Sequence, residues 1–352
     1  MFSRIVCLLL LCPMLLAGAG ERLRVVSLNA EWFPGRVPKP SPAQQARHIA
    51  GVRRLFHDLD PDLLLLQEIV QPAALEKALA VQPDVSVYAI SAFTNNPLQL
   101  VIAGRLPLVA ADAKPWPAKD DRSEQGPPRG IAFAAVELPD GGLLLVFTLH
   151  LKSNYRGDED YNEQRNVRMR EESVRLFLAN VKTVERRFAG RTVRGVVLGG
   201  DLNTLYPKSV YRGEKTMSLL EAGGFVHLGS SGLDHFWGKG ITNAAFSVFT
   251  DYKVSDHAPV ILDIALDGDR RIPRKPVMAL AALAGAAGNA RTDINKAAIP
   301  ELMSLPRIGP VLAQRIVDGR PFGSVEEMAD VCGIGPATLE GIRPHIEAVP
   351  VD

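Results

Sequence analysis

Short, almost continuously apolar runs recur between residues 23 and 266 of this 352-residue chain, and they constrain its fold more than any other feature. Polar stretches of helix-compatible composition separate them. A strand that lacks the alternation of apolar and polar residues is buried on both faces, so its sheet needs a covering layer on either side. The runs are LRVVSLN, DLLLLQE, LLLVFTLHL, VRGVVLGGDLN and PVILDIAL. They predict an α/β fold.

Two of the polar stretches, residues 47–59 and 162–188, have the length and charge distribution of surface helices. Helices of this kind cover the outer faces of buried sheets and give a layered arrangement. We therefore expect a two-sheet α/β sandwich that occupies residues 20–267.

The first twenty residues, MFSRIVCLLLLCPMLLAGAG, have the pattern of a secretory signal peptide. Arg4 precedes an apolar run, and the small residues 17–19 follow it. The run holds about 12 apolar residues, fewer than the roughly 20 that a membrane-spanning helix needs. We expect residues 1–19 to be removed, the mature chain to have no stable membrane insertion, and its location to be secreted or periplasmic.

Charge and cysteine content narrow the expectations further. The formal net charge of +1 gives no global attraction to a polyanion, so a nucleic-acid partner has to be recognised by local groups. Cys7 and Cys12 leave with the signal peptide, and the mature chain keeps only Cys332. Its core therefore has no internal disulfide to stabilise it.

The C-terminal part has a different organisation. Residues 268–290 are rich in charge and proline and then in alanine, which is typical of a linker. Beyond them, Ile308-Gly309-Pro310 and Ile334-Gly335-Pro336 lie 26 residues apart. This offset predicts a small all-α domain over residues 291–352, built from two helical hairpins.

Chemically useful side chains recur where the apolar runs end, and the ends of buried strands are where α/β folds build their sites. Each residue taken alone has an ordinary role as a cap, a turn residue or a satisfied core histidine. Their number and order are harder to explain in that way. The residues are Asn29, Glu68, His150, Asp201, Asn203, Asp234, Asp256 and His257.

The segments around these residues resemble the endonuclease/exonuclease/phosphatase superfamily, which has the deoxyribonuclease I-like fold. The resemblance covers roughly residues 22–266 and rests on VVSLNAEW, PDLLLLQE, TLHLKS, GGDLNT, LDHFW and SDHAPV. It implies hydrolysis of a phosphodiester with a divalent cation. Glu68 would be the principal ligand of Mg²⁺, or of Mn²⁺ or Ca²⁺, with Asn29 and Asp256 nearby, since Mg²⁺ prefers one or two carboxylates and keeps several waters.

The resemblance also implies roles in proton transfer. His257, oriented by Asp234 through its other ring nitrogen, is a candidate general base, and Asp201 is the alternative. His235 stands beside Asp234 where we expect an aromatic or aliphatic residue.

The remaining candidates would act on the phosphate. Asp201 and Asn203 would position the attacking water and the phosphoryl oxygens. His150 would polarise the phosphate or protonate the leaving group, and Lys152 lies within reach of the scissile phosphate because it shares the strand face of His150.

The segment 292–347 resembles the tandem helix-hairpin-helix module of competence-type DNA receptors. Such hairpins bind the DNA backbone through free N–H groups at helix N-termini, without sequence preference. Two features depart from this pattern: Arg307 replaces the first glycine, and residues 291–350 hold six basic against eight acidic side chains. A protein-docking or structural role is therefore an alternative. The DNA-binding residues implied are Ile308, Gly309, Gly333, Ile334 and Gly335.

Both modules together predict an exported, metal-dependent nuclease acting on DNA, with RNA as a further substrate to test. A phosphodiesterase for a lipid headgroup or a small phosphate ester is one alternative, and the hairpins argue against it. A non-catalytic DNA-binding or uptake protein is the other, and the complete set of candidate catalytic residues argues against that.

Overall fold

The computed structural model describes residues 22–93, 96–116, 126–154, 161–266, 272, 275, 292–297, 299–302, 305 and 308–349. The predicted signal peptide, residues 1–19, lies outside these ranges. No helix within them is long and apolar enough to cross a membrane.

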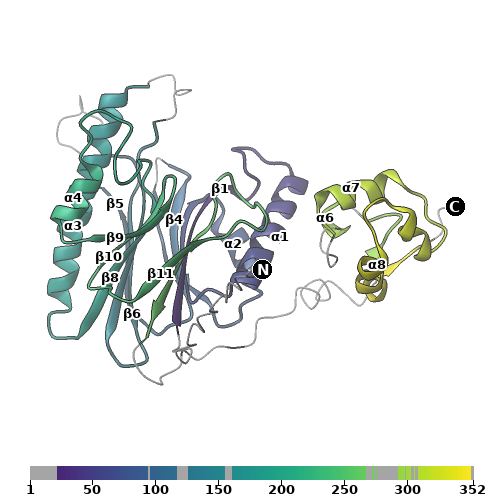
Figure 1. Cartoon of the computed structure of the whole chain (residues 1–352), viewed down its shortest axis with the longest axis horizontal. Helices are drawn as coiled ribbons and strands as arrows, with labels where there is room; N and C mark the ends of the chain where they lie inside the picture. The colour runs from purple at the N-terminus through teal and green to yellow at the C-terminus, as the bar shows by residue number, and fades with distance from the viewer. Residues whose placement is uncertain are drawn as a thin grey trace, which may run out of the picture.

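Two six-stranded sheets face each other and form the middle layers of a sandwich (Figure 1). One sheet has the order β11-β12-β1-β2-β4-β3 and the other β5-β6-β7-β8-β10-β9. The strands are β1 (Arg22–Phe33), β2 (Leu63–Ile69), β3 (Ser86–Ile90), β4 (Gln99–Gly104), β5 (Leu108–Pro115), β6 (Gly130–Glu137), β7 (Leu143–His150), β8 (Val193–Asp201), β9 (Val226–Ser231), β10 (Asp234–Lys239), β11 (Ala244–Val248) and β12 (Val260–Ala265).

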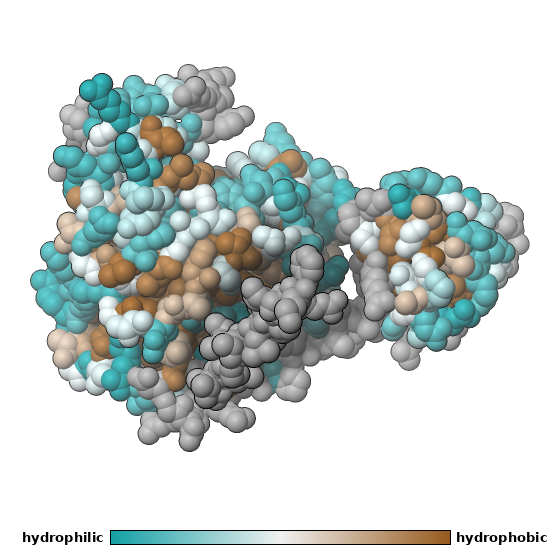
Figure 2. Space-filling model, viewed as in Figure 1, coloured by the Kyte–Doolittle hydropathy of each residue, from teal (hydrophilic) through white to brown (hydrophobic). Residues whose placement is uncertain are grey.

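Helices cover the outer face of each sheet. Helices α1 (Pro42–Leu59) and α2 (Pro72–Leu79) pack on the first sheet, and α3 (Glu163–Arg187) and α4 (Thr216–Ala222) on the second (Figure 1). Leu65 and Val146 lie between the two sheets. Leu55 of α1 and Phe177 of α3 lie between these helices and the sheets that the helices cover. The predicted α/β sandwich with sheets buried on both faces is confirmed. In Figure 2, hydrophobic residues gather on the visible face over the strands and, in a smaller group, on the C-terminal region.

Local sequence explains where the long helices begin. Ser41 is the N-cap of α1: its hydroxyl accepts from the Gln44 N–H, the Gln44 side chain bonds back to the Ser41 N–H, and Pro42 opens the first turn. The carbonyl oxygen of the Asn162 side chain caps α3 in the same way by accepting from the Arg165 N–H at 2.8 Å.

Strand direction decides which residues meet. The pairs β1/β2 and β7/β8 are parallel, so their carboxyl ends lie at the same end of the sandwich. Strands β6 and β10 are antiparallel to β7 and β8 and therefore begin at that end. His150 and Asp234 both pair in register with Asp201, which places the three residues side by side.

The C-terminal region forms its own small core. Its elements are β13 (Thr292–Asp293), α6 (Ile299–Leu302), α7 (Pro310–Asp318), a 3₁₀ helix (Glu326–Asp330), α8 (Pro336–Ile342), a second 3₁₀ helix (Arg343–His345) and β14 (Ile346–Glu347). Ile316 and Ile342, which are 26 residues apart, are both fully buried. The internal repeat therefore marks equivalent core positions of two hairpins.

Two residues of the predicted linker are described, and both contact the sandwich. Ile272 is 3% exposed and packs between the sheets, and the Lys275 N–H donates to Asp84 Oδ2 at 2.8 Å.

Candidate active site

The centre of the site is a chain of hydrogen bonds between Asn29, Glu68 and Asp201. Asn29 Nδ2 donates to Glu68 Oε1 at 3.2 Å and to Asp201 Oδ2 at 3.0 Å, and so joins the two sheets. Glu68 Oε2 accepts from the Trp32 N–H at 3.1 Å. Glu68 has a φ of 61° and Trp32 one of 52°, an unusual left-handed backbone that aims their polar groups into the site.

His257 approaches Asp201 from the other side. Its Nδ1 lies 2.6 Å from Asp234 Oδ2, and its Nε2 lies 3.8 Å from Asp201 Oδ2. Burial acts to lower the pKa of His257, but the hydrogen bond and charge of Asp234, with the charge of Asp201, outweigh it and raise the pKa to about 10. The contact with Asp234 therefore favours the protonated form of His257.

Asp201 is a weaker acid than an ordinary aspartic acid. Burial, and then the charge of Asp234, raise the pKa of Asp201 to about 7, although His257 and the hydrogen bond from Asn29 oppose the rise. A carboxylate that changes protonation near neutral pH is suited to accept a proton from water.

His150 lies on the floor of the site. Its Nε2 is 3.4 Å from Asp201 Oδ2 and 3.7 Å from Glu68 Oε1, and the side chain is almost completely buried. Burial, together with the charge of Arg129, lowers the pKa of His150 well below 6.5. A neutral imidazole can donate one hydrogen bond to a phosphate oxygen, but its single N–H is a much weaker acid than an imidazolium and is poorly suited to protonate a leaving group. Of the two roles predicted for His150, the lowered pKa is compatible with polarisation of the phosphate.

The loop after β8 places Asn203 beside the strand that carries His150. The Asn203 N–H donates to Asp201 Oδ1 at 2.9 Å and its Nδ2 to the Leu151 carbonyl at 3.1 Å. Lys152 follows Leu151 in the chain, and its positive charge contributes to the lowered pKa of His150. Asn203 therefore lies beside Asp201, whereas Lys152 follows the end of β7 at His150 and does not share a strand with it.

Asp256 is the most exposed of the predicted catalytic and metal-binding residues. Its side chain is 62% exposed, and Oδ1 lies 4.0 Å from His257 Nε2. Its N–H donates to Glu31 Oε2 at 2.7 Å. The preceding residue, Ser255, is buried: its hydroxyl donates to the Asn29 carbonyl at 2.7 Å and accepts from the His257 N–H at 3.1 Å. Ser255 thus fixes the loop that carries His257.

Arg129 is a charged member of the site that sequence analysis missed. Its guanidinium is buried, NH1 donates to the carbonyls of His150 and Leu151 at 3.2 and 3.0 Å, and its charge acts on Glu68 and Asp201. Burial lowers the pKa of Arg129, while the two carboxylates raise it. Among the described residues, its Nε has no hydrogen-bond partner.

Two further buried polar residues hold the frame of the site. Gln67 Nε2 donates to Thr148 Oγ1 at 2.8 Å and so links the two sheets below Glu68. His235 is fully buried, its Nε2 bonds the Thr204 carbonyl at 2.9 Å, and burial lowers its pKa to about 4. The unexpected histidine beside Asp234 therefore has a structural reason, since it connects β10 to the loop that follows Asn203.

The five residues expected to bind DNA divide into two kinds. Ile308 and Ile334 are 3% and 4% exposed and belong to the core of the hairpins. Gly309 and Gly335 are the N-caps of α7 and α8, with open space where a side chain would lie. Gly333 has a φ of +99°, and a Cβ there would lie 2.7 Å from Leu312 Cδ2, so this position requires glycine.

The donor set fits a hard divalent cation. Carboxylate oxygens of Glu68 and Asp201 face one another across Asn29, and ligand atoms of Asp201, Asp234 and His257 lie within 4.8 Å of one another. Carboxylate oxygens at this spacing are the hard ligands that Mg²⁺ and similar cations prefer. Asn29 Oδ1 accepts from the Glu31 N–H at 3.1 Å, so in this orientation Asn29 supports the carboxylates as a donor.

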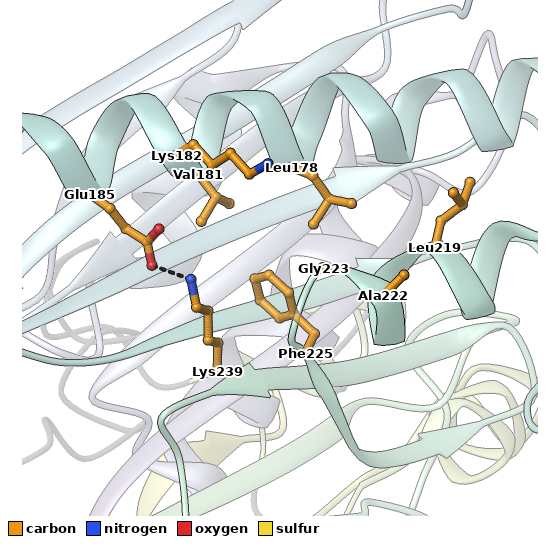
Figure 3. Close-up of a pocket in the computed structure, with 9 residues that line it drawn as sticks. All are labelled: Leu178, Val181, Lys182, Glu185, Leu219, Ala222, Gly223, Phe225 and Lys239. Carbon is orange, nitrogen blue, oxygen red and sulfur yellow. Dashed lines mark hydrogen bonds and ion pairs between the residues drawn. The ribbon is translucent and has the colours of Figure 1, made fainter.

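A cavity of about 180 Å³ between α3 and α4 is separate from this site (Figure 3). Leu178 and Phe225 line it, and the ion pair between Lys239 Nζ and Glu185 Oε1, 2.7 Å long, closes one side. None of the predicted site residues borders it.

Comparison with known proteins identifies the class. The model of the endonuclease/exonuclease/phosphatase family matches residues 26–257, and that of the helix-hairpin-helix motif matches residues 289–347. The chain therefore belongs to the endonuclease/exonuclease/phosphatase family and carries a helix-hairpin-helix region at its C-terminal end. Both resemblances noted in the sequence are confirmed.

Individual relatives agree with this assignment. A deoxyribonuclease of Thioalkalivibrio sp. (strain K90mix) is 35% identical over 96 residues, which are 27% of this chain and a quarter of that protein. A family protein of Beutenbergia cavernae superposes with a TM-score of 0.52 at 19% identity, covering 70% of this chain and 72% of the other. Beta toxin of Staphylococcus aureus superposes with a TM-score of 0.50 at 13% identity, covering 68% of this chain and 99% of the other. These two likenesses establish the fold.

Proposed function

We propose that this chain is an exported, divalent-metal-dependent phosphodiesterase that hydrolyses DNA. The observation that carries the proposal is the continuous set of contacts from Glu68 through Asn29 to Asp201, and from Asp201 to both His150 and His257. The relative named as a deoxyribonuclease and the hairpin region favour DNA over other diesters. Export is supported by the sequence of residues 1–19.

Glu68 is the residue that we propose as the principal ligand of Mg²⁺, with Asp201 on the opposite side of Asn29. When bound, the cation neutralises charge on the phosphate and lowers the pKa of nearby water. Mn²⁺ and Ca²⁺ prefer the same oxygen ligands.

The protein's own groups would handle the proton and the phosphate charge. Asp201, poised near neutrality, accepts the proton of the attacking water as the water oxygen bonds to phosphorus. The P–O bond to the leaving oxygen breaks, and that oxygen takes up a proton from solvent. The imidazolium of His257, held by Asp234, and the guanidinium of Arg129 stabilise the negative phosphoryl oxygens. His150 and Asn203 add hydrogen bonds that orient the phosphate. This assignment favours Asp201 over His257 as the general base.

A cleavage assay of the mature protein tests the proposal. Supercoiled plasmid, linear duplex, single-stranded DNA and RNA are incubated with Mg²⁺, with Mn²⁺, with Ca²⁺ and with a chelator. We expect metal-dependent cleavage of DNA that the chelator abolishes. Cleavage of a choline phosphodiester lipid without cleavage of DNA would replace the proposal by the lipid-headgroup alternative, and binding of DNA without any cleavage would make the protein a non-catalytic binder.

A further inference from the structure

A loop of residues 204–215, which we call the 204–215 loop, begins directly after Asn203 and leads into α4. It borders a cavity of about 460 Å³. This volume lies within the range of ligand pockets, about 300 to 1,000 Å³, and is sufficient for one nucleotide unit of a strand. The loop begins at the end of the sandwich where β7 and β8 end, which is also the end that carries His150 and Asp201.

A buried ion pair holds the loop in one conformation. Arg170 Nε and Glu214 Oε1 are 2.7 Å apart, and the two side chains are 0% and 1% exposed. The hydroxyls of Thr204, Ser209 and Thr216 all donate to the carboxylate of Glu214. The beginning and the middle of the loop and the first residue of α4 are therefore bonded to one charged group.

The same ion pair connects the loop to the reaction centre. Arg170 NH1 donates to the Lys152 carbonyl at 3.0 Å, two residues past His150. The Tyr211 ring packs against the Arg170 guanidinium, with 5.0 Å from Cζ to the ring centroid. Tyr211 thereby fixes the backbone of Val210 and Arg212 on either side of it.

Exposed cations lie on this fixed loop. Lys208, Arg212 and Lys215 are exposed, and among the described residues none of them forms an ion pair. The charge of Glu214 is neutralised by Arg170 inside the protein, so it does not cancel them. The remaining acidic group at the cavity, Glu221, accepts a hydrogen bond from the Tyr206 hydroxyl at 3.3 Å. The outer surface of the loop is thus positive.

We propose that the 204–215 loop is a subsite for the DNA backbone, in which Lys208 and Arg212 bind phosphates of the strand that is held at the reaction centre. The inference rests on the proposed nuclease function. A preformed loop loses little conformational freedom when it binds, and cations without protein partners release counterions from DNA when they bind its phosphates. A flexible loop with paired charges would have neither property.

The test compares Lys208→Glu/Arg212→Glu with a matched control, Lys182→Glu/Arg186→Glu. The control makes the same change of net charge on exposed residues in the C-terminal half of α3, at the opposite end of the sandwich. For both variants and the wild type, KM and kcat are measured on duplex DNA over a series of salt concentrations. Turnover of bis(p-nitrophenyl) phosphate, a small diester that has no flanking phosphates, serves as the check on folding and chemistry.

We expect the loop variant to raise KM for DNA by roughly tenfold or more at moderate salt and to reduce the salt slope of log KM by about 1.8, since each bound phosphate contributes about 0.9. Turnover of the small diester stays at the wild-type value, and the control variant changes neither quantity. Equal KM values and salt slopes for the loop variant and the control would overturn the subsite while leaving the nuclease intact. A wild-type protein that does not cleave DNA at all overturns the proposed function and this inference with it.

Discussion

At the scale of single residues, Glu68 decides whether the site holds a cation. Glu68→Gln keeps the shape of the side chain but removes the negative charge, so we expect activity to fall by orders of magnitude and an excess of Mg²⁺ to restore part of it. Titration of activity against Mg²⁺ measures this. Glu137→Gln is the control, because Glu137 is a half-exposed partner of Arg191 on the surface. Near wild-type turnover of Glu68→Gln at limiting Mg²⁺ would exclude Glu68 as the principal ligand.

The pH dependence of turnover distinguishes the two candidate bases. Asp201 accepts a proton only when ionised, so with its pKa raised to about 7 the rate should rise as the pH increases through neutrality. His257, with its pKa raised to about 10, stays protonated until the alkaline side. The wild-type profile should therefore be bell-shaped, and its acidic limb should move to lower pH as Mg²⁺ is increased, because a cation favours the carboxylate.

Two variants assign the limbs of that profile. Asp201→Asn should lose the acidic limb and His257→Ala the alkaline one, each at a cost of about 10² to 10⁴ in rate. The reverse result, in which the acidic limb disappears in His257→Ala and persists in Asp201→Asn, would make His257 the base.

The sequence predicts most of this site because strand ends carry its polar residues. Arg129 was not predicted, and the reason is physical. It precedes Gly130 at the start of β6, and because β6 is antiparallel to β7, the start of β6 lies at the same end of the sandwich as the end of β7. Ser255 and Gln67 were not predicted because each stands next to a residue with a clearer catalytic chemistry, Asp256 and Glu68, and neither carries a charge of its own. Their value arises only from tertiary neighbours, which the order of residues along the chain does not reveal.

At the scale of elements, the buried pair of Arg170 on α3 and Glu214 before α4 joins two segments that pack on the second sheet. Glu214→Ala leaves a charged guanidinium buried without its partner, which costs about 3 to 5 kcal/mol of unfolding free energy. Urea unfolding followed by tryptophan fluorescence measures the loss in the sandwich alone, because all three tryptophans, Trp32, Trp116 and Trp237, lie there.

A surface ion pair provides the comparison for that measurement. Glu137→Ala removes the partner of Arg191, and with both side chains 42% exposed it should cost no more than about 1 kcal/mol. The double variant Arg170→Met/Glu214→Met should lose less than Glu214→Ala, since no buried charge remains. If Glu214→Ala is as stable as Glu137→Ala, then water reaches Arg170 and the 204–215 loop is less rigid than its contacts indicate.

The central strands were predictable as elements, and the edge strands less so. β7 is buried at all eight positions and reads as the run LLLVFTLH. The edge strand β5 is exposed or partly exposed throughout and contains Asp112 and Lys114, so its sequence gives little strand signal. Edge strands are defined by the neighbour that they pair with, and that neighbour is not encoded in their own composition.

At the scale of the whole molecule, the chain combines a catalytic sandwich with a hairpin region that holds none of the proposed catalytic groups. Residues 291–350 have more acidic than basic side chains, so the hairpins cannot attract DNA by net charge. Binding there would depend on backbone N–H groups at the N-termini of α7 and α8. The 204–215 loop and the hairpins would then contribute differently, one by positive side chains beside the reaction and the other by holding long DNA.

Removal of the hairpin region tests this division. Because Ile272 packs between the sheets and the Lys275 N–H bonds Asp84, the chain should be cut after residue 276 to leave the sandwich intact. Turnover at saturating DNA should barely change, whereas affinity for long DNA should fall and its salt dependence should become shallower by about 0.9 for each phosphate that the hairpins no longer bind.

Gly309→Val/Gly335→Val in the full chain should reproduce the effect, since the added side chains point into open space and would obstruct the N–H groups without disturbing the hairpin core. Gly341→Ala, also facing open space but away from a helix start, is the matched control. Unaltered affinity and salt slope in the truncated enzyme would show that the hairpins dock to something other than DNA. The excess of acidic side chains in the hairpins would then explain why they do not bind DNA.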